Sequence, residues 1–214
     1  MSALTAIIRR DVATAFRSSA LLPLVFFLLI ATLYPFAVGP DAALLGRTGG
    51  GLLWVAALLA ALLPVDRLIA PDAEAEMLDQ YALRGISDEA IAAAKILAHW
   101  LSFGPPLMLA ALPAAALLRL DGAMIVRIEI GLAIGTPGLA ALALATACLT
   151  AGLRGAGALA GLMMLPLAIP LLIFAAGSLA PGGTGAVKLL AATSLLLVAG
   201  APFAAGAALR ALRD

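Results

Sequence analysis

Residues 66–95 read DRLIAPDAEAEMLDQYALRGISDEAIAAAK. This segment, called the polar loop below, holds seven of the twelve acidic residues of the 214-residue chain. They are Asp66, Asp72, Glu74, Glu76, Asp79, Asp88 and Glu89. The whole chain is 64% hydrophobic and only 12% charged, whereas about a quarter of the residues of a soluble domain are charged. So little polar surface cannot cover a water-soluble globule, which indicates a membrane protein whose polar loop lies in water.

Six apolar segments are long enough to cross a bilayer as helices, which takes about 17–25 residues. They are residues 20–39, 49–65, 96–118, 130–153, 156–179 and 186–209. Residues 40–50 and 119–129 are expected to be connections. We also expect a break in the fourth span at Gly135-Thr136-Pro137-Gly138 and bends at Pro166 and Pro170 in the fifth. The sequence thus predicts an all-α polytopic protein in which residues 1–214 form a single transmembrane domain.

Residues 2–18 have the pattern of a helix lying on the membrane surface. One broad side is apolar and includes Leu4, Ile7 and Val12, while arginines occupy the other. Asp11 interrupts the apolar side. The alternative is a frayed cytoplasmic tail.

Lysine and arginine counts indicate the orientation, because these residues are enriched in cytoplasmic segments. Six spans place both termini and the polar loop on one side. Nine basic residues fall on that side: Arg9, Arg10, Arg17, Arg67, Arg84, Lys95, Arg154, Arg210 and Arg213. Four fall on the other: Arg47, Arg119, Arg127 and Lys188. We therefore expect both termini and the polar loop in the cytoplasm.

The polar loop itself is expected to form a helix over residues 72–83. Pro71 and Asp72 suit a helix start, and Gly85 suits a stop after Arg84. Ser87 then caps a second helix that continues through Lys95 into the third span.

The first loop helix is the best functional candidate, because its apolar face can insert into a groove on a cytoplasmic partner. The surrounding acids would fix its orientation and steer association. The candidate partner-contacting residues are Glu74, Glu76, Met77, Leu78, Tyr81 and Arg84. The alternative is a solvated helix lying on its own membrane domain.

His99 and Trp100 form the other conspicuous pair, at the start of the third span. One interpretation is an axial haem ligand or a gate residue. The other, which we favour, is an interfacial histidine beside a tryptophan of the aromatic belt, since Lys95 is expected at the lipid headgroups. The motifs Gly131-x-x-x-Gly135 and Gly157-x-x-x-Gly161 are expected to pack helices closely within the chain.

The sequence lacks the features that are typical of several classes of protein function. We expect no ionisable group deep in any span, which argues against an ion-coupled transporter, and Lys188 lies near a span end. Both lysines follow residues other than glycine, so a phosphate-binding Gly-Lys-[Ser/Thr] motif is absent. One cysteine and one histidine supply neither a cysteine metal cluster nor a catalytic set, and a net charge of +1 gives no argument for nucleic acid. We therefore expect no catalytic residues, no metal, and an energy source in another protein.

The polar loop is similar to the loop after the second span in permeases of the ABC-2 type. Further stretches resemble haem exporter protein B of the cytochrome c maturation system, the CcmB family. They are ALLPLVFFLLIATLYPF (20–36), VGP (38–40), LWVAALLA (53–60), DRL (66–68), KILAHWL (95–101), GTP (135–137) and LPLAIPLLIFAAG (165–177). The family loop tends to carry a glycine within its acidic helix, where this chain has Met77, so we expect a more continuous helix here.

The resemblance implies a permease subunit of an ABC complex in the bacterial inner membrane. Its partners would be an ATP-binding subunit, one haem-handling membrane subunit, one small membrane subunit and a periplasmic haem chaperone. Two copies of this chain would be expected, with haem as the substrate and ATP bound only by the ATP-binding partner. The alternatives are a secondary transporter of a small apolar solute and a membrane scaffold that transports nothing.

Overall fold

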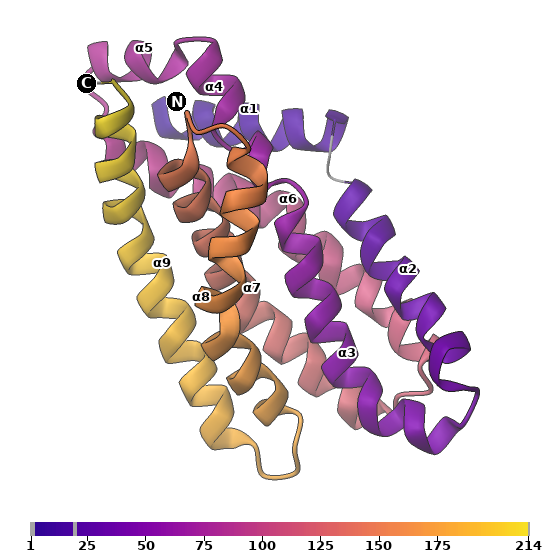
Figure 1. Ribbon diagram of the computed structural model, residues 1–214. Coiled ribbons are helices and arrows are strands. Elements are labelled where there is room, and N and C mark those ends of the chain that lie inside the picture. The colour runs from indigo at the N-terminus through magenta and orange to yellow at the C-terminus, as the bar shows by residue number, and fades with distance from the viewer. Residues whose placement is uncertain (1–2, 19–20, 214) are drawn as a thin grey trace.

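A computed structural model describes residues 3–18 and 21–213, and the described chain is helical apart from short turns (Figure 1). The helices are α1 (Ala3–Ser18), α2 (Leu21–Val38), α3 (Ala42–Leu62), the 3₁₀ turn η1 (Val65–Arg67), α4 (Ala70–Glu74), α5 (Met77–Leu83), α6 (Asp88–Leu117), α7 (Gly122–Thr150), α8 (Ala156–Ser178) and α9 (Thr184–Arg213). Within these residues six helices, α2, α3, α6, α7, α8 and α9, are long and apolar enough to cross a membrane. The predicted all-α, six-span membrane protein is therefore confirmed. Ser2 and Ala20, where two expected helices begin, lie outside the described residues.

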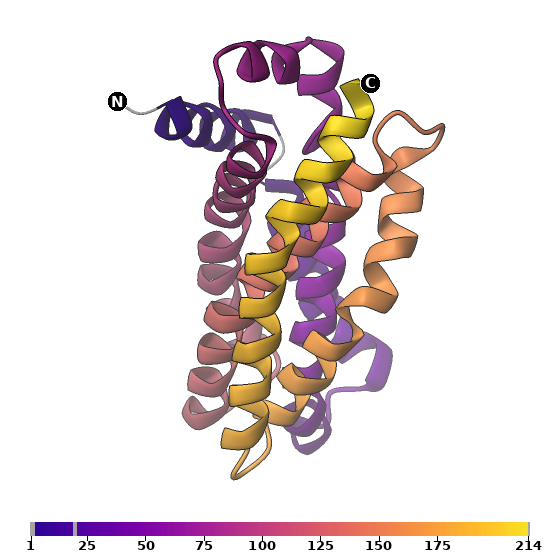
Figure 2. The same cartoon turned by 90° about the vertical axis from the view of Figure 1, so that its left-hand side faces the viewer.

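The six spans form a bundle whose centre is α7. This helix packs against α6, α8 and α9, and most of its side chains are buried (Figure 2). By contrast, α2 packs mainly on α3 and α6 and leaves Leu22, Val25 and Leu29 exposed, as a lipid-facing helix does. One end of the bundle carries α1, which lies across it, together with α4, α5 and the end of α9 (Figures 1 and 2). We call this the polar end.

Two of the expected connections are shorter than the sequence suggested, because aspartates cap the helices that follow. The side chain of Asp41 accepts hydrogen bonds from the backbone N–H groups of Ala43 (2.8 Å) and Leu44 (3.3 Å), so α3 begins at Ala42. Asp121 accepts one from the N–H of Met124 (2.7 Å), so α7 begins at Gly122. As a result Glu129, expected in a connection, lies inside α7.

The expected break at residues 135–138 is wrong, since α7 continues through Pro137. In this turn of the helix, Thr136 Oγ1 donates a hydrogen bond to the carbonyl oxygen of Leu132 (2.7 Å). The small residues in this stretch are explained by close packing between helices. A Cβ on Gly138 would lie 2.9 Å from Ser194 Oγ of α9, so this glycine allows α7 and α9 to approach closely.

The Gly131-x-x-x-Gly135 motif packs against an indole ring rather than against the backbone of another helix. Trp54 of α3 is buried against it, and a Cβ would lie 3.0 Å from the ring at Gly131 and 2.6 Å at Gly135. The second motif behaves differently at its two ends. Gly157 approaches Asp66, where a Cβ would come within 2.9 Å, whereas Gly161 faces open space. Close packing is therefore confirmed for three of these four glycines.

We predict that Gly135→Ala destabilises the protein by about 1–3 kcal/mol, because the new methyl group overpacks the site of Trp54. Gly161→Ala is the matched control and is expected to be neutral or slightly stabilising, since alanine favours a helix by about 1 kcal/mol. Thermal unfolding of both purified variants in detergent measures the difference. Equal unfolding temperatures would contradict the packing described for Trp54.

Candidate functional site

The helix expected over residues 72–83 is two helices. α4 ends at Glu74 and α5 begins at Met77, with Glu76 in the left-handed region at φ 53°. The expectation of a more continuous helix is therefore wrong. On a straight helix Asp72 and Tyr81, nine residues apart, would point to opposite sides, because each residue turns the chain by about 100°. The break allows both side chains to be buried against the same bundle.

The apolar face of α5 lies against its own protein. Leu78 and Tyr81 are only 4% and 6% exposed, and Met77 is half-buried. This arrangement matches the alternative considered from the sequence, a loop helix lying on its own membrane domain.

The outward side of the loop is acidic, with one large apolar side chain. Glu74, Glu76 and Arg84 of the candidate set are exposed, as is Asp79. Leu83, at 88%, is the most exposed large hydrophobic side chain in the described part of the protein. The sequence analysis does not name Leu83 as a candidate, because it expects the apolar face with Met77, Leu78 and Tyr81 to meet the partner.

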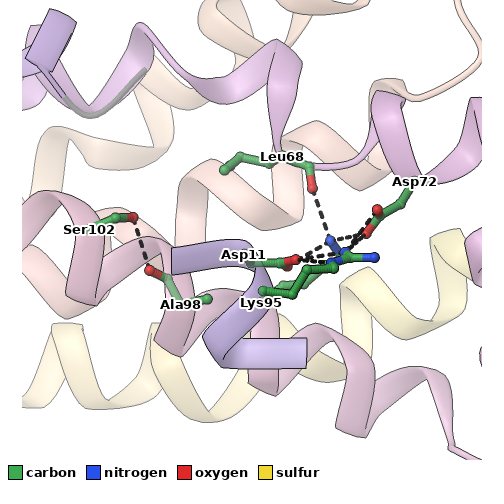
Figure 3. A network of polar contacts seen from close by, with 7 residues as sticks. Asp11, Leu68, Asp72, Lys95, Ala98 and Ser102 are labelled. Carbon is green, nitrogen blue, oxygen red and sulfur yellow. Dashed lines mark hydrogen bonds and ion pairs between the residues drawn. The ribbon is translucent and has the colours of Figure 1, made fainter. Parts of the chain in front are cut away.

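Four charged side chains meet at α1 and form what we call the ionic cluster: Arg10, Asp11, Asp72 and Lys95. Figure 3 labels Asp11, Asp72 and Lys95 of this cluster. Lys95 Nζ of α6 lies 3.0 Å from Asp11 Oδ2 of α1 and also contacts Asp72 of α4. It donates further to the carbonyl oxygen of Leu68 (3.4 Å). Arg10 donates from Nη2 to Asp11 Oδ1 and to Asp72 Oδ2, both at 2.6 Å. The cluster therefore joins α1, the polar loop and the third span.

The charges in this cluster balance, which is why they can be buried. Lys95 is only 4% exposed. Burial opposes ionisation of Asp72, but the ammonium of Lys95 and the guanidinium of Arg10 outweigh it and lower the pKa of this carboxyl. Burial also opposes the charge of Arg10, yet its bonds to Asp11 and Asp72 raise the pKa of the guanidinium. Arg10 also lies over the ring of Tyr81, with Cζ 5.8 Å from the ring centroid. This interaction connects α5 to the ionic cluster.

None of these four residues was predicted from the sequence to have a site role, and Lys95 was expected at the lipid headgroups. The structure buries Lys95 within the protein near the start of α6. The available signal was Asp11, an acid on the apolar side of an amphipathic helix. An acid at such a position indicates a buried basic partner.

A second set of ion pairs fastens the polar loop to the end of α9. Arg213 Nη2 donates to Asp88 Oδ2 and Arg210 Nη1 to Glu89 Oε1, each at 2.5 Å. Arg213 Nη1 also donates to the carbonyl oxygen of Leu78 (3.4 Å). Gly206 permits the approach, because a Cβ there would lie 3.1 Å from the backbone nitrogen of Glu89.

His99 and Trp100 point to different neighbours. His99 is 6% exposed, stacks on Phe103 with ring centroids 5.6 Å apart, and has no hydrogen-bond partner at Nε2 among the described residues. Trp100 Nε1 donates to Thr136 Oγ1 of α7 (3.1 Å). The ring of His99 is therefore enclosed by protein, and its position at the membrane interface stays a prediction.

A cavity of about 290 Å³ lies between the ionic cluster and His99. Its lining includes Arg10, Arg67, Lys95, His99 and Phe103. Among residues 3–18 and 21–213 no group of three histidine, cysteine or acidic side chains could hold a metal ion.

We predict that Asp72→Asn lowers the free energy of unfolding by about 3 kcal/mol, because it leaves the buried Lys95 undercompensated. Asp79→Asn is the matched control in the same loop. Asp79 is exposed and should change stability by less than about 0.5 kcal/mol. Thermal unfolding in detergent compares the two variants.

The pH dependence of unfolding has a definite sign. Because the pKa of Asp72 is lowered in the folded protein, its stabilisation is fully present above the unfolded pKa of about 3.9 and is lost as pH falls through the folded value. The Asp72→Asn variant should therefore lose less stability than the wild type as the pH falls, because it has no carboxyl group at this position. Identical acid profiles for the wild type and the variant would contradict the assignment.

Comparison with known proteins identifies relatives over nearly the whole chain. The family model described as CcmB protein matches residues 2–212. A protein named heme exporter protein B from Rhodobacter capsulatus is 42% identical over 96% of this chain and 97% of its own length. Proteins of the same name from Paracoccus denitrificans and Escherichia coli K12 are 45% and 38% identical, over 88% and 95% of this chain and 89% and 96% of their own lengths. The chain, with its six spans and its polar loop fastened to one end, therefore belongs to the CcmB protein family.

Proposed function

We propose that this chain is the haem-export permease subunit of an ABC transporter complex that serves cytochrome c maturation in the bacterial inner membrane. The name shared by its relatives, heme exporter protein B, supports the substrate class. The observation that carries the mechanism is the polar end, where the loop is bound to the bundle by two sets of ion pairs. Because the loop is held in this way, its movement can be transmitted to the membrane spans.

ATP hydrolysis belongs to a separate protein in this proposal, and the polar loop is where that ATPase docks. The exposed acids Glu74, Glu76 and Asp79 steer the approach of a basic surface. Leu83 supplies the apolar anchor, since its side chain is 88% exposed at the water-facing end of the protein. The docking face is thus the outward side of the loop, opposite Leu78 and Tyr81.

Movement of the docked loop reaches the membrane by three contacts. Asp72 transmits it to Lys95 of α6, and Arg10 transmits it to α1. Arg213 holds both the carbonyl oxygen of Leu78 and the carboxylate of Asp88, so α9 follows as well. ATP-driven closure of the partner would tilt these helices together.

The remaining components of the proposal are those that the family resemblance implies. One membrane partner handles haem, another is a small membrane protein, and the complex delivers haem to a periplasmic chaperone or releases the loaded chaperone. Two copies of this chain would pair with two copies of the ATPase. In this scheme the chain holds haem only as passing cargo, and ATP stays in the ATPase.

We predict that Leu83→Asp or Glu76→Lys weakens co-purification with the ATPase by about tenfold, because each change removes or reverses a group on the docking face. Both residues are exposed, so the unfolding temperature should stay within about 1 °C of wild type. Arg47→Glu, an exposed charge reversal at the opposite end, is the control and should leave co-purification unchanged. Wild-type binding in both loop variants would remove the docking role.

We also predict that the polar end faces the cytoplasm. Cys148 is buried, and replacing it by alanine gives a cysteine-free background. Ala82→Cys on α5 and Ala43→Cys on α3 then report opposite ends from exposed positions. An impermeant thiol reagent added to cells with a permeabilised outer membrane should label the second and spare the first. Labelling of Ala82→Cys would place the loop beyond reach of a cytoplasmic ATPase.

A further inference from the structure

The cavity under α1 has the features of a ligand site that the proposed transport cycle does not use. Its volume of about 290 Å³ lies near the lower end of the range for small-molecule pockets, about 300–1,000 Å³. The lining combines charged and apolar side chains. Arg10, Arg67 and Lys95 are among the charged ones, and Pro23, Phe103 and Leu144 are among the apolar ones. Such a lining suits an amphiphile with a charged head.

The charges of the lining favour an anionic head. Three cations, Arg10, Arg67 and Lys95, face two carboxylates, Asp11 and Asp72, so one positive charge is left over. Arg10 and Lys95 are already paired with the two aspartates. Arg67 is exposed and makes no ion pair with any other residue in the described ranges. The excess charge therefore belongs to Arg67, whose guanidinium is suited to bind a phosphate group through two hydrogen bonds.

A buried histidine with an unsatisfied ring nitrogen belongs to the lining of the cavity. His99 lines it, and its Nε2 atom is buried without a hydrogen-bond partner among the residues described. Buried polar atoms in native proteins are nearly always paired with protein, water or ligand. A neutral imidazole can donate from one ring nitrogen to a phosphate or ester oxygen. Nε2 is covered by protein in this structure, so the ring must turn toward the cavity to donate to a headgroup oxygen.

The place of the cavity indicates that the amphiphile comes from the bilayer. The amphipathic helix α1 lies across the bundle end (Figure 1). Amphipathic helices placed in this way lie at the level of the lipid headgroups. Pro23 of α2 lines the cavity, and its neighbours Leu21, Leu22 and Val25 are exposed apolar side chains. The lipid-facing surface therefore begins beside the cavity. Cytoplasmic leaflets are rich in anionic lipids, which basic residues at this depth attract.

From these observations we infer that the cavity beneath α1 binds the phosphate headgroup of an anionic phospholipid, with Arg67 holding the phosphate and His99 donating to a headgroup oxygen. The lipid would then fill the space between α1, α2 and α6 and strengthen the attachment of α1. This lipid site needs only the present chain, so it is independent of haem export and of the partner proteins.

Lipid titration of the purified full-length chain in a neutral detergent tests the inference. Phosphatidylglycerol should raise the unfolding temperature with saturation, and native mass spectrometry should find it retained. Phosphatidylcholine with the same acyl chains and inorganic phosphate at equal concentration should produce no comparable shift. A shift of equal size with phosphatidylcholine would show that the head is not recognised. The same shift with inorganic phosphate would assign the cavity to a dissolved anion and overturn the lipid source.

Variants locate the site. Arg67→Gln should raise the half-saturating concentration of phosphatidylglycerol about tenfold, because it removes the charge-assisted bonds to phosphate. His99→Gln should weaken binding as well. Arg47→Gln removes another exposed arginine, at the other end of the bundle, and should leave the titration unchanged. Arg67 is exposed, so its replacement tests binding without a folding defect, and equal titrations for Arg67→Gln and Arg47→Gln would overturn the inference.

Discussion

The contact on which the polar end depends is the one between the buried ammonium of Lys95 and the carboxylates of Asp11 and Asp72. A lysine that is 4% exposed in a chain this apolar requires compensation, because an unpaired buried charge costs several kcal/mol. The two acids come from segments that lie far apart in the sequence. Meeting that electrostatic demand therefore draws α1 and α4 onto the same turn of α6.

The pairing of Lys95 with the two carboxylates also determines the shape of the polar loop. Asp72 must point inward to reach Lys95, and Tyr81 points inward to lie beneath Arg10. A straight helix cannot bury both, so the chain breaks at Glu76, which adopts a positive φ. Strain of this kind persists only where the surroundings hold it. The outward face that results carries the acids and Leu83.

The remainder of the bundle is held by dispersion and close packing rather than by charge. Without a hydrophobic driving force between helices in lipid, small residues allow backbones and rings to approach. Trp54 resting on Gly131 and Gly135 is the clearest case, and Ser194 facing Gly138 is another. The charged polar end and the close-packed apolar bundle therefore depend on different physics. A variant can loosen the attachment of α1 and the loop without disturbing the centre of α7.

Composition and the lengths of the apolar segments were sufficient to determine six helical spans, because lipid forces backbone polar groups into helices. The residues of the ionic cluster were visible in the sequence only as isolated charges, with Asp11 as an anomaly on an apolar side. The sequence could not show that Lys95 is buried, that Leu78 and Tyr81 face inward, or that Leu83 faces out. These features depend on which side of each short helix meets the bundle, and contacts between residues as far apart as Asp11 and Lys95 decide that.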